Sequence, residues 1–460
     1  MDRISAATAE ALRRFADDGE NRVAVYYGSA YIDRKPALEA FLSGRRFLYH
    51  RAACVNDHEQ LRRLTLMLRE RGVSLSGEVT YEAVFSAIIS MIPAGRRLVL
   101  LFDDFENFFY EKSGFTEALF RMLDAPEHAG RITVFLLSDD EVWVENSLVE
   151  RAGSYAGRID GFVKKRPAGF AELRAAFPGL SMRDAIAWYA VFGGETALWQ
   201  TIDPAASFKN NICRLFLTDA HPASLSDLAE KRLAELVREP AVYATILANL
   251  ADGKEKLNDL YHATGIPRAK LSVYLKTLMS PGFVEKVFSY GVVGARHTKK
   301  GVYRISNAFM RFSYAALYPH PGAALYGDPA RAYDLWIAPS LAGTLNNAYR
   351  IVCTEYINRL DEQSRLPFAI AEEGEWNGKA GAIDIVAESE EGETLIGLCA
   401  YDRILTEDDY HFALQYARQA GLDPDHCYLF SGEGFGSELT TAARHVAGLH
   451  LIGLEELEHV

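Results

Sequence analysis

The chain has 460 residues, of which 49% are hydrophobic and 24% charged, so it can bury several cores and is too long for one compact domain. Its net charge of −13 excludes a surface that binds a polyanion throughout. The charge is uneven, however: residues 253–305 hold ten Lys or Arg against three Asp or Glu (+7), whereas residues 361–460 hold five Lys or Arg against twenty-one Asp or Glu (−16). Because the chain shows no signal segment, no apolar run approaching the roughly 20 residues that span a bilayer and no paired cysteines, we expect a cytoplasmic protein with no membrane, disulfide or zinc site.

Two apolar strands near the amino terminus predict the frame of a nucleotide site. Residues 21–27 (NRVAVYY) form the first strand, Gly28 a turn, and a helical pattern begins near Lys35, which is the layout of a phosphate-binding loop. The second strand, residues 97–102 (RLVLLF), ends in Asp103 and Asp104. A nucleotide-hydrolysing fold places a magnesium-orienting carboxylate and then a water-activating one at that point.

The residues of this loop differ from the phosphate-loop sequence pattern. In the pattern GxxxxGK[ST] the second glycine lets the backbone approach the phosphates, the lysine reaches their oxygens and the hydroxyl holds magnesium. Here only Gly28 fits, since Asp33 replaces the glycine, Arg34 the lysine and Lys35 the hydroxyl residue. A carboxylate about 4 Å from a phosphate charge costs about 4 kcal/mol at an effective dielectric near 20. Two interpretations stay open. The loop only connects the strand to the helix, or Arg34 and Lys35 at the start of the helix still bind ATP with magnesium weakly.

These stretches resemble the archaeal-type ATPase family within the AAA and STAND-like P-loop proteins, whose members typically have VVYGRRRVGKT at the loop and DEF after the second strand. RVAVYYGSAYIDRK and LLFDDF are similar in frame, SYAGRIDGF resembles a segment that implies Arg158 near the phosphates, and residues 189–217 resemble the helical lid of that family. Asp104 stands where the family has glutamate, which withdraws the carboxylate from an attacking water. We therefore expect no ATP hydrolysis.

The middle of the chain predicts a winged helix-turn-helix. Helical patterns over 240–253 and 256–265 are followed by a turn at Ile266-Pro267, a third helix to Leu278 and two strands, 283–288 and 301–306. Leu271, Leu275 and Leu278 share one face of the third helix, which leaves a cationic outer face. The candidate nucleic-acid contacts are Arg268, Lys270, Ser272, Lys276, Lys299 and Lys300. DNA is the expected partner, and a protein-interaction module is the alternative.

The last quarter alternates helices and strands and predicts a small α/β domain. It resembles the restriction-endonuclease-like domain of the same family, in which an Asp, a Glu-x-Lys triplet and a helical Glu hold a divalent ion. The resemblance makes Asp384 a vestigial ligand, because Leu398 and Ala400 stand where Glu and Lys are expected and Arg350 stands in the helix. One carboxylate cannot hold magnesium for hydrolysis, so we expect no nuclease activity and no metal.

The predicted fold class is α/β multidomain, with a P-loop ATPase-like parallel sheet over 1–165, a helical lid over 166–238, a winged helix over 239–320 and a nuclease-like domain over 321–460. The leading functional hypothesis is an inactive ATPase-family protein that acts as a scaffold or DNA-associated regulator. The alternative is a nucleotide-binding switch with little or no hydrolysis. A third class, a structural protein that binds a protein partner or a second copy of itself, stays open.

Overall fold

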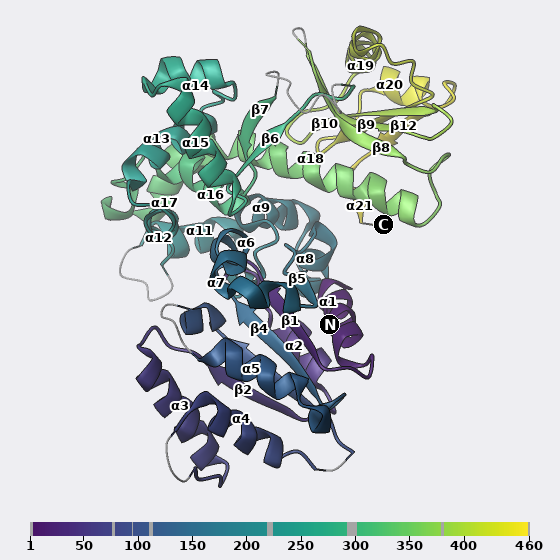
Figure 1. Cartoon of the computed structure of the whole chain (residues 1–460). Helices are drawn as coiled ribbons and strands as arrows, with labels where there is room; N and C mark the ends of the chain where they lie inside the picture. Colours follow the sequence, from purple (N-terminus) through teal and green to yellow (C-terminus); the bar gives the residue numbers. More distant parts are fainter. Residues whose placement is uncertain are drawn as a thin grey trace. The chain divides into compact units, whose positions relative to one another are not determined.

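The computed structural model describes residues 3–75, 79–93, 95–109, 114–218, 224–291, 301–378 and 381–458. The chain divides into two compact units, Met1–Ala168 with Glu195–Ala197, and Gly169–Gly194 with Leu198–Val460 (Figure 1). The predicted lid, winged helix and C-terminal domain therefore fall almost entirely within the second unit. None of the helices in the described ranges combines the length and apolarity that crossing a bilayer requires.

The first unit is built on a five-stranded parallel sheet with the order β2-β3-β4-β1-β5. Its strands are β1 (Arg22–Tyr27), β2 (Phe47–Arg51), β3 (Leu98–Asp103), β4 (Ile132–Ser138) and β5 (Gly161–Lys164). The two strands predicted from the sequence agree with β1 and β3 to within one residue. The α/β fold class with a parallel sheet is thus confirmed.

Helices cover both faces of this sheet (Figure 1). They are α1 (Arg3–Ala16), α2 (Lys35–Leu42), α3 (Asp57–Glu70), α4 (Tyr81–Ser90), η1 (Phe105–Phe109), α5 (Phe115–Asp124), η2 (Pro126–His128), α6 (Glu141–Asn146), α7 (Leu148–Ala152) and η3 (Gly153–Arg158). Side chains alternate along β1, so Val23 and Val25 pack with α3, α4 and α5, whereas Ala24 and Tyr26 pack with α1 and α2. This double coverage explains why the strands are almost continuously apolar.

The parallel register brings three strand ends to one edge of the sheet. Tyr27 of β1 lies opposite Ser138 of β4, and Asp103 of β3 lies opposite Leu137 of β4. The residues that follow β1 and β4, together with the last residue of β3, therefore meet at the carboxyl edge. Open α/β sheets bind their ligands at this edge.

Helices that correspond to the predicted lid come next. They are α8 (Phe170–Ala176), α9 (Met182–Phe192), α10 (Thr196–Trp199), α11 (Phe208–Phe216) and α12 (Leu228–Leu236). All of them except the first two residues of α10 belong to the second unit. The fully buried Trp188 and Phe192 of α9 stack with ring centroids 5.4 Å apart, and Phe192 lies 6.4 Å from Phe309 of α16 (Ala308–Phe312). An apolar aromatic cluster thus joins these helices into one body.

Three helices and an antiparallel strand pair follow, in the order expected for a winged helix. They are α13 (Pro240–Ala251), α14 (Leu257–Thr264), α15 (Arg268–Met279), β6 (Val284–Val287) and β7 (Val302–Ile305). Gly265 ends α14 in the left-handed conformation with φ of +70°, which makes the tight turn into α15. The identification of this module as a DNA-binding winged helix stays a prediction.

The C-terminal part is a mixed five-stranded sheet of order β12-β11-β10-β9-β8, in which β8 and β9 are antiparallel additions. Its strands are β8 (Glu372–Asn377), β9 (Ala382–Glu388), β10 (Thr394–Ala400), β11 (His426–Ser431) and β12 (Leu449–Ile452). The remaining helices are η4 (Ser313–Leu317), η5 (Ala323–Leu325), α17 (Pro329–Ala332), η6 (Tyr333–Ile337), α18 (Ala338–Glu362), α19 (Glu407–Ala420), α20 (Ser437–Ala442) and α21 (Leu454–Leu457). The predicted α/β domain is therefore observed; its likeness to nucleases stays a prediction.

Candidate functional site: the carboxyl edge of the parallel sheet

The loop from Gly28 to Lys35 uses its backbone amides within the protein. Five of these amides donate to acceptors of the chain: Gly28 N to Ser138 O (3.3 Å), Tyr31 N to Ser29 Oγ (3.2 Å), Ile32 N to Ser29 O (3.1 Å), Asp33 N to Thr196 Oγ1 (2.8 Å) and Lys35 N to Asp33 Oδ1 (2.9 Å). A phosphate loop aims such amides at a bound anion. Here the Asp33 carboxylate accepts the amide at the start of α2, so it takes a bond that a phosphate oxygen would need.

Arg34, at the lysine position of the loop, binds the carboxylate that follows in β3. Its Nη2 lies 2.7 and 2.6 Å from the two oxygens of Asp103, whose side chain is 2% exposed. Asp103 also accepts from the hydroxyl of Tyr49 at 2.5 Å and from the Asp104 amide at 2.8 Å. A carboxylate offers about four lone-pair sites. These four bonds use all of them, and Asp103 keeps none for a magnesium ion or its waters.

A second ion pair, between buried Lys165 and partly exposed Asp139, continues this network. Lys165 follows β5, is 4% exposed, and donates from Nζ to Asp139 Oδ1 at 2.7 Å, while Arg34 Nη1 reaches the same oxygen at 3.2 Å. Burial lowers the pKa of Lys165, and the Asp139 carboxylate opposes that shift. Gly28 has φ of +145°, and a Cβ built on it would lie 2.9 Å from Lys165 Cβ. Glycine is required there because Lys165 packs directly over the turn.

The other carboxylate of the strand end faces a different partner. Asp104 has φ of +48° and its Oδ2 lies 2.5 Å from Nε of Arg51 on β2. Two residues on, Oε2 of Glu106 is buried with no hydrogen-bond partner among the described residues. Burial raises the pKa of Glu106 to about 7, and the charges of Asp104 and Asp140 raise it as well. Asp104 is thus held in an ion pair with Arg51, whereas Glu106 is a buried carboxyl whose pKa lies near neutral pH.

The prediction for Arg158 is wrong. Its guanidinium binds Asp124 at 2.5 Å and lies 4.8 Å from the ring of Phe120, and its charge interacts with Asp160, which accepts from Val23 N at the start of β1. Arg158 therefore lies at the amino-terminal edge of the sheet. At about 3.3 Å per residue, a six-residue strand separates it from the Gly28 loop by more than 15 Å.

The structure brings Gly28, Asp33, Arg34 and Asp103 to one edge of the sheet, and the network there contains three further residues that the sequence analysis missed. Tyr49, Asp139 and Lys165 come from β2 and from the ends of β4 and β5. Strand 132–138 (ITVFLLS) is followed by two aspartates, much as Asp103 ends strand 98–103 and Asp104 follows it, and this repeated pattern could have indicated Asp139. Lys35 does not join the network, since its side chain is 75% exposed.

The predicted DNA-contact face lies on α15. Leu271, Leu275 and Leu278 are fully buried, and the side chains of Lys270, Ser272 and Lys276 are exposed, in agreement with the helical pattern. Arg268 is held by α14, where it bonds Asn258 and lies 4.1 Å from the ring of Tyr261. Lys299 and Lys300 lie outside the described residues.

The start of the predicted wing is attached to the C-terminal sheet. Tyr290 N donates to Glu375 O at 2.7 Å, and Asn377 N donates to Ser289 Oγ at 2.9 Å, so these residues cover the open edge of β8. These contacts attach the segment that follows β6 to the C-terminal sheet, and α15 is the described part of the predicted nucleic-acid interface.

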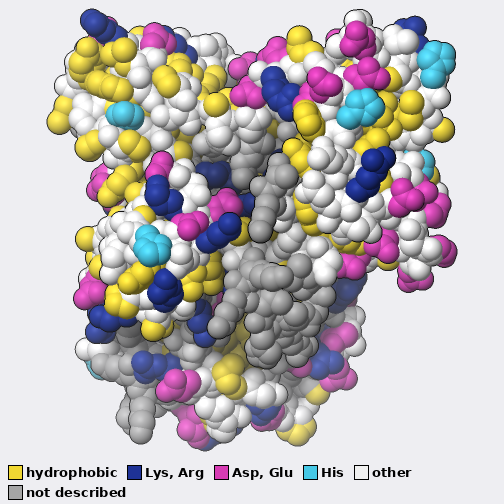
Figure 2. Space-filling model, turned by 90° about the horizontal axis from the view of Figure 1, so that it is seen from above, with side chains coloured by type: hydrophobic (Ala, Val, Ile, Leu, Met, Phe, Trp, Pro, Cys, Tyr) yellow, Lys and Arg dark blue, Asp and Glu magenta, His cyan; other side chains and the backbone are white. Residues whose placement is uncertain are grey.

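Arginines also lie where the nuclease resemblance expects metal ligands. Arg350 of α18 and Arg304 of β7 both bind the carboxylate of Glu375, the second at 2.5 Å. Asp384 accepts from Cys399 N at 2.8 Å; burial raises its pKa and the charge of Arg350 lowers it. Among the described residues no group of three or more His, Cys, Asp and Glu could hold a metal ion. Figure 2, in which this domain lies on the right, shows acidic side chains over its surface.

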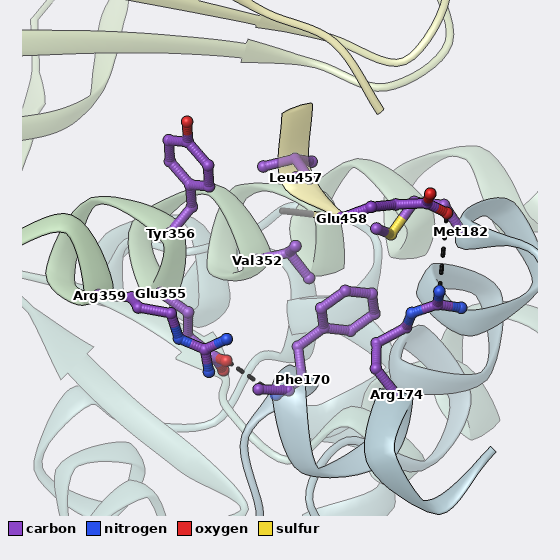
Figure 3. Close-up of a pocket in the computed structure, with 10 residues that line it drawn as sticks. Phe170, Arg174, Met182, Val352, Glu355, Tyr356, Arg359, Leu457 and Glu458 are labelled. Atoms are coloured by element: carbon purple, nitrogen blue, oxygen red, sulfur yellow. Dashed lines mark hydrogen bonds and ion pairs between the residues drawn. The ribbon is translucent and has the colours of Figure 1, made fainter. Parts of the chain in front are cut away.

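A cavity of about 190 Å³ lies between α8, α9, α18 and α21 (Figure 3). Its charged groups are paired within the chain: Arg174 lies 3.6 Å from Glu458, and Glu355 accepts from Phe170 N at 2.8 Å and from the hydroxyl of Tyr189 at 2.9 Å. Burial raises the pKa of Glu355. A ligand would have to displace these partners, so we assign no function to this cavity.

Comparisons with known proteins give remote likenesses. No protein-family model matches the chain. The chain is 21% identical over 387 residues to the uncharacterized protein MJECL04 of Methanocaldococcus jannaschii, covering 82% of each chain. It is similar to the Walker-type ATPase PABY2304 of Pyrococcus abyssi (14% identity, TM-score 0.48, covering 67% of this chain and 94% of that one) and to the ORC2 protein of Aeropyrum pernix (14%, 0.42, 77% and 96%). These values carry no argument about activity, and the fold class rests on the sheet itself.

The ion pair of Arg34 and Asp103 should dominate the stability of this edge. We expect Arg34→Ala to lower the free energy of unfolding by about 3–5 kcal/mol, because it leaves a buried carboxylate without its cation. Lys35→Ala is the matched control, and its exposed side chain predicts a change within about 0.5 kcal/mol. Chemical denaturation followed by circular dichroism measures both. Equal effects of the two substitutions would contradict the assignment.

Glu106 should make stability depend on pH. Its folded pKa of about 7 exceeds the unfolded value of 4.5, so the folded state retains a proton that the unfolded state loses, and stability falls between about pH 4.5 and pH 7. The shift corresponds to about 3 kcal/mol. We expect Glu106→Gln to be close to the original chain at pH 5 and more stable at pH 8, as measured by denaturation at both pH values. Parallel pH profiles would show that burial does not perturb this carboxyl.

Proposed function

We propose that this chain is a catalytically inactive relative of the P-loop ATPases, which acts in the cytoplasm as a scaffold or regulator and uses its three-helix module to bind DNA. The observation that carries the proposal is the ion pair of Arg34 with Asp103. The residue that would bind phosphate neutralises the residue that would orient magnesium, and Lys165 with Asp139 extends the same pairing. The site is thus charge-balanced by its own side chains.

The free-energy cost of binding Mg-ATP supports the proposal that the site is inactive. Binding of Mg-ATP would separate Arg34 from Asp103, at a cost of about 3–5 kcal/mol for a broken buried pair. It would also bring phosphate charge close to the Asp33 carboxylate, which costs about 4 kcal/mol at 4 Å. A micromolar site supplies about 8 kcal/mol of binding free energy. The two costs together remove most of it.

The DNA part of the proposal rests on the outer face of α15. Lys270 and Lys276 lie six residues apart on α15, about one and two-thirds turns, and their side chains and that of Ser272 are exposed. Short polar and cationic residues on an exposed helix after a tight turn match a recognition helix. The acidic C-terminal domain would be repelled by a phosphate backbone, which confines such a contact to this module. In the protein-interaction alternative, the same face binds a protein instead.

The first test is a thermal-shift titration with Mg-ATP and an assay of phosphate release. We expect no change in Tm and no turnover above a preparation from empty vector, because the ion pairs occupy the site. A ligand present at a hundred times its Kd would add about 2.7 kcal/mol of stability, which is readily detected. Stabilisation without turnover would favour the nucleotide switch instead.

A restored loop provides the comparison for this test. The variant Asp33→Gly/Arg34→Lys/Lys35→Thr regains the full phosphate-loop pattern and loses the carboxylate from the cradle. We expect Mg-ATP to stabilise this variant and not the original chain. Stabilisation of the original chain alone would contradict the account.

The second test concerns DNA. We expect Lys270→Glu/Lys276→Glu to weaken binding of duplex DNA at least tenfold at low salt and to reduce the slope of log K against log salt by about 1.8, since each phosphate contact contributes about 0.9. Fluorescence anisotropy at several salt concentrations measures both quantities. Lys35→Glu/Lys231→Glu makes the same change of net charge at exposed positions elsewhere and should leave binding nearly unchanged. Equal losses in both variants would indicate a nonspecific charge effect.

A further inference from the structure

A cavity of about 390 Å³ lies at the amino-terminal edge of the parallel sheet. Its floor is apolar and consists of Ile88, Met91 and Ile92 from the end of α4 with Leu98 at the start of β3. Strands β2 and β3 run from this edge to Arg51 and Asp103 at the other. At about 3.3 Å per residue the strands separate the cavity from the Arg34 network by about 15 Å, so the two are distinct.

Four arginines surround this apolar floor. They are Arg45, Arg46, Arg71 and Arg97, and no aspartate or glutamate is among the described residues that line the cavity. The acids that face the cluster from outside the lining are Asp17, which binds Arg45 at 2.6 Å, and Asp18; both interact with Arg97. The cavity therefore keeps an excess of positive charge.

Backbone carbonyls hold three of these guanidinium groups in place. Arg45 Nε donates to Phe41 O at 3.0 Å, Arg71 Nη1 to Met67 O at 3.0 Å and Arg97 Nη2 to Glu20 O at 2.6 Å. A guanidinium has five N–H donors, so each retains others after these bonds. Fixed donors of this kind lose little entropy when they bind an anion, and their planar fork suits phosphate and carboxylate groups.

We infer that this cavity binds a small amphiphilic anion, whose phosphate or carboxylate group meets the arginines while its apolar body lies on the floor formed by α4 and β3. The volume falls in the range of about 300–1,000 Å³ that is usual for small-molecule sites. Positive charge alone would attract inorganic phosphate, and an apolar floor alone would attract any hydrocarbon. Their combination in one cavity requires both parts in one molecule.

Calorimetric titration of the full chain with octyl phosphate below its micelle concentration tests this inference. We expect one site per chain and a Kd at least tenfold lower than that of inorganic phosphate, with no binding of the uncharged octyl glucoside. Equal affinity for inorganic phosphate, or binding of octyl glucoside, would overturn the inference. So would binding confined to phosphatidylcholine vesicles that contain phosphatidic acid, because that result would indicate a membrane surface and not a cavity ligand.

Substitutions inside and outside the cavity test whether octyl phosphate binds there. Arg46→Gln/Arg71→Gln, which changes two exposed side chains, should weaken octyl phosphate binding at least tenfold, whereas Arg62→Gln/Arg121→Gln, at exposed arginines outside the cavity, should not. Met91→Glu places a carboxylate among the arginines and should abolish octyl phosphate binding in a variant that circular dichroism shows to be folded. The variant with the restored phosphate loop is altered only at the opposite edge and should bind octyl phosphate as the original chain does. Unchanged affinity in Arg46→Gln/Arg71→Gln would overturn the inference.

Discussion

The first unit depends on a buried ion pair between the loop after β1 and the last residue of β3. Asp103 is nearly inaccessible, and an isolated carboxylate at such depth would be strongly destabilising. Arg34 compensates that charge, and Tyr49 and the Asp104 amide satisfy the remaining lone pairs. Because the pair joins two strands on either side of β4, it also fixes the edge at which a parallel sheet would otherwise bind a ligand.

The same solution occurs at the second place where the family resemblance implies a metal ion. In the C-terminal domain Arg350 and Arg304 bind Glu375 close to Asp384, so guanidinium groups supply the positive charge that the buried carboxylates need. A carboxylate site that has lost its metal ligands must protonate, become exposed or acquire a cation from the protein. At both places an arginine pairs with a carboxylate of the chain, which balances its charge.

The sequence predicted the parts of this arrangement that depend on local pattern. Apolar runs located β1 and β3, and helical periodicity identified the buried leucines of α15. It did not reveal that β4 lies between β1 and β3, because strand order is set by packing over the whole sheet. For this reason Asp139 and Lys165 were missed, and Arg158 was placed by resemblance at the wrong edge. Residues within one strand and its following loop could therefore be predicted from the sequence. Residues that meet only because several strands lie side by side could not.

The loop after β1 is held by several contacts within the first unit. A ligand shifts a conformational equilibrium only by as much as its affinities for the two states differ, and a triphosphate at this edge would compete with the two ion pairs of Arg34 with Asp103 and of Lys165 with Asp139. Segment 195–197 also bonds the loop directly, through Thr196 to Asp33 and Ala197 to Tyr31. The contacts through which a bound nucleotide could act on the loop are already made by the chain itself. The proposed scaffold role accords with this arrangement, because the loop has its partners within the chain.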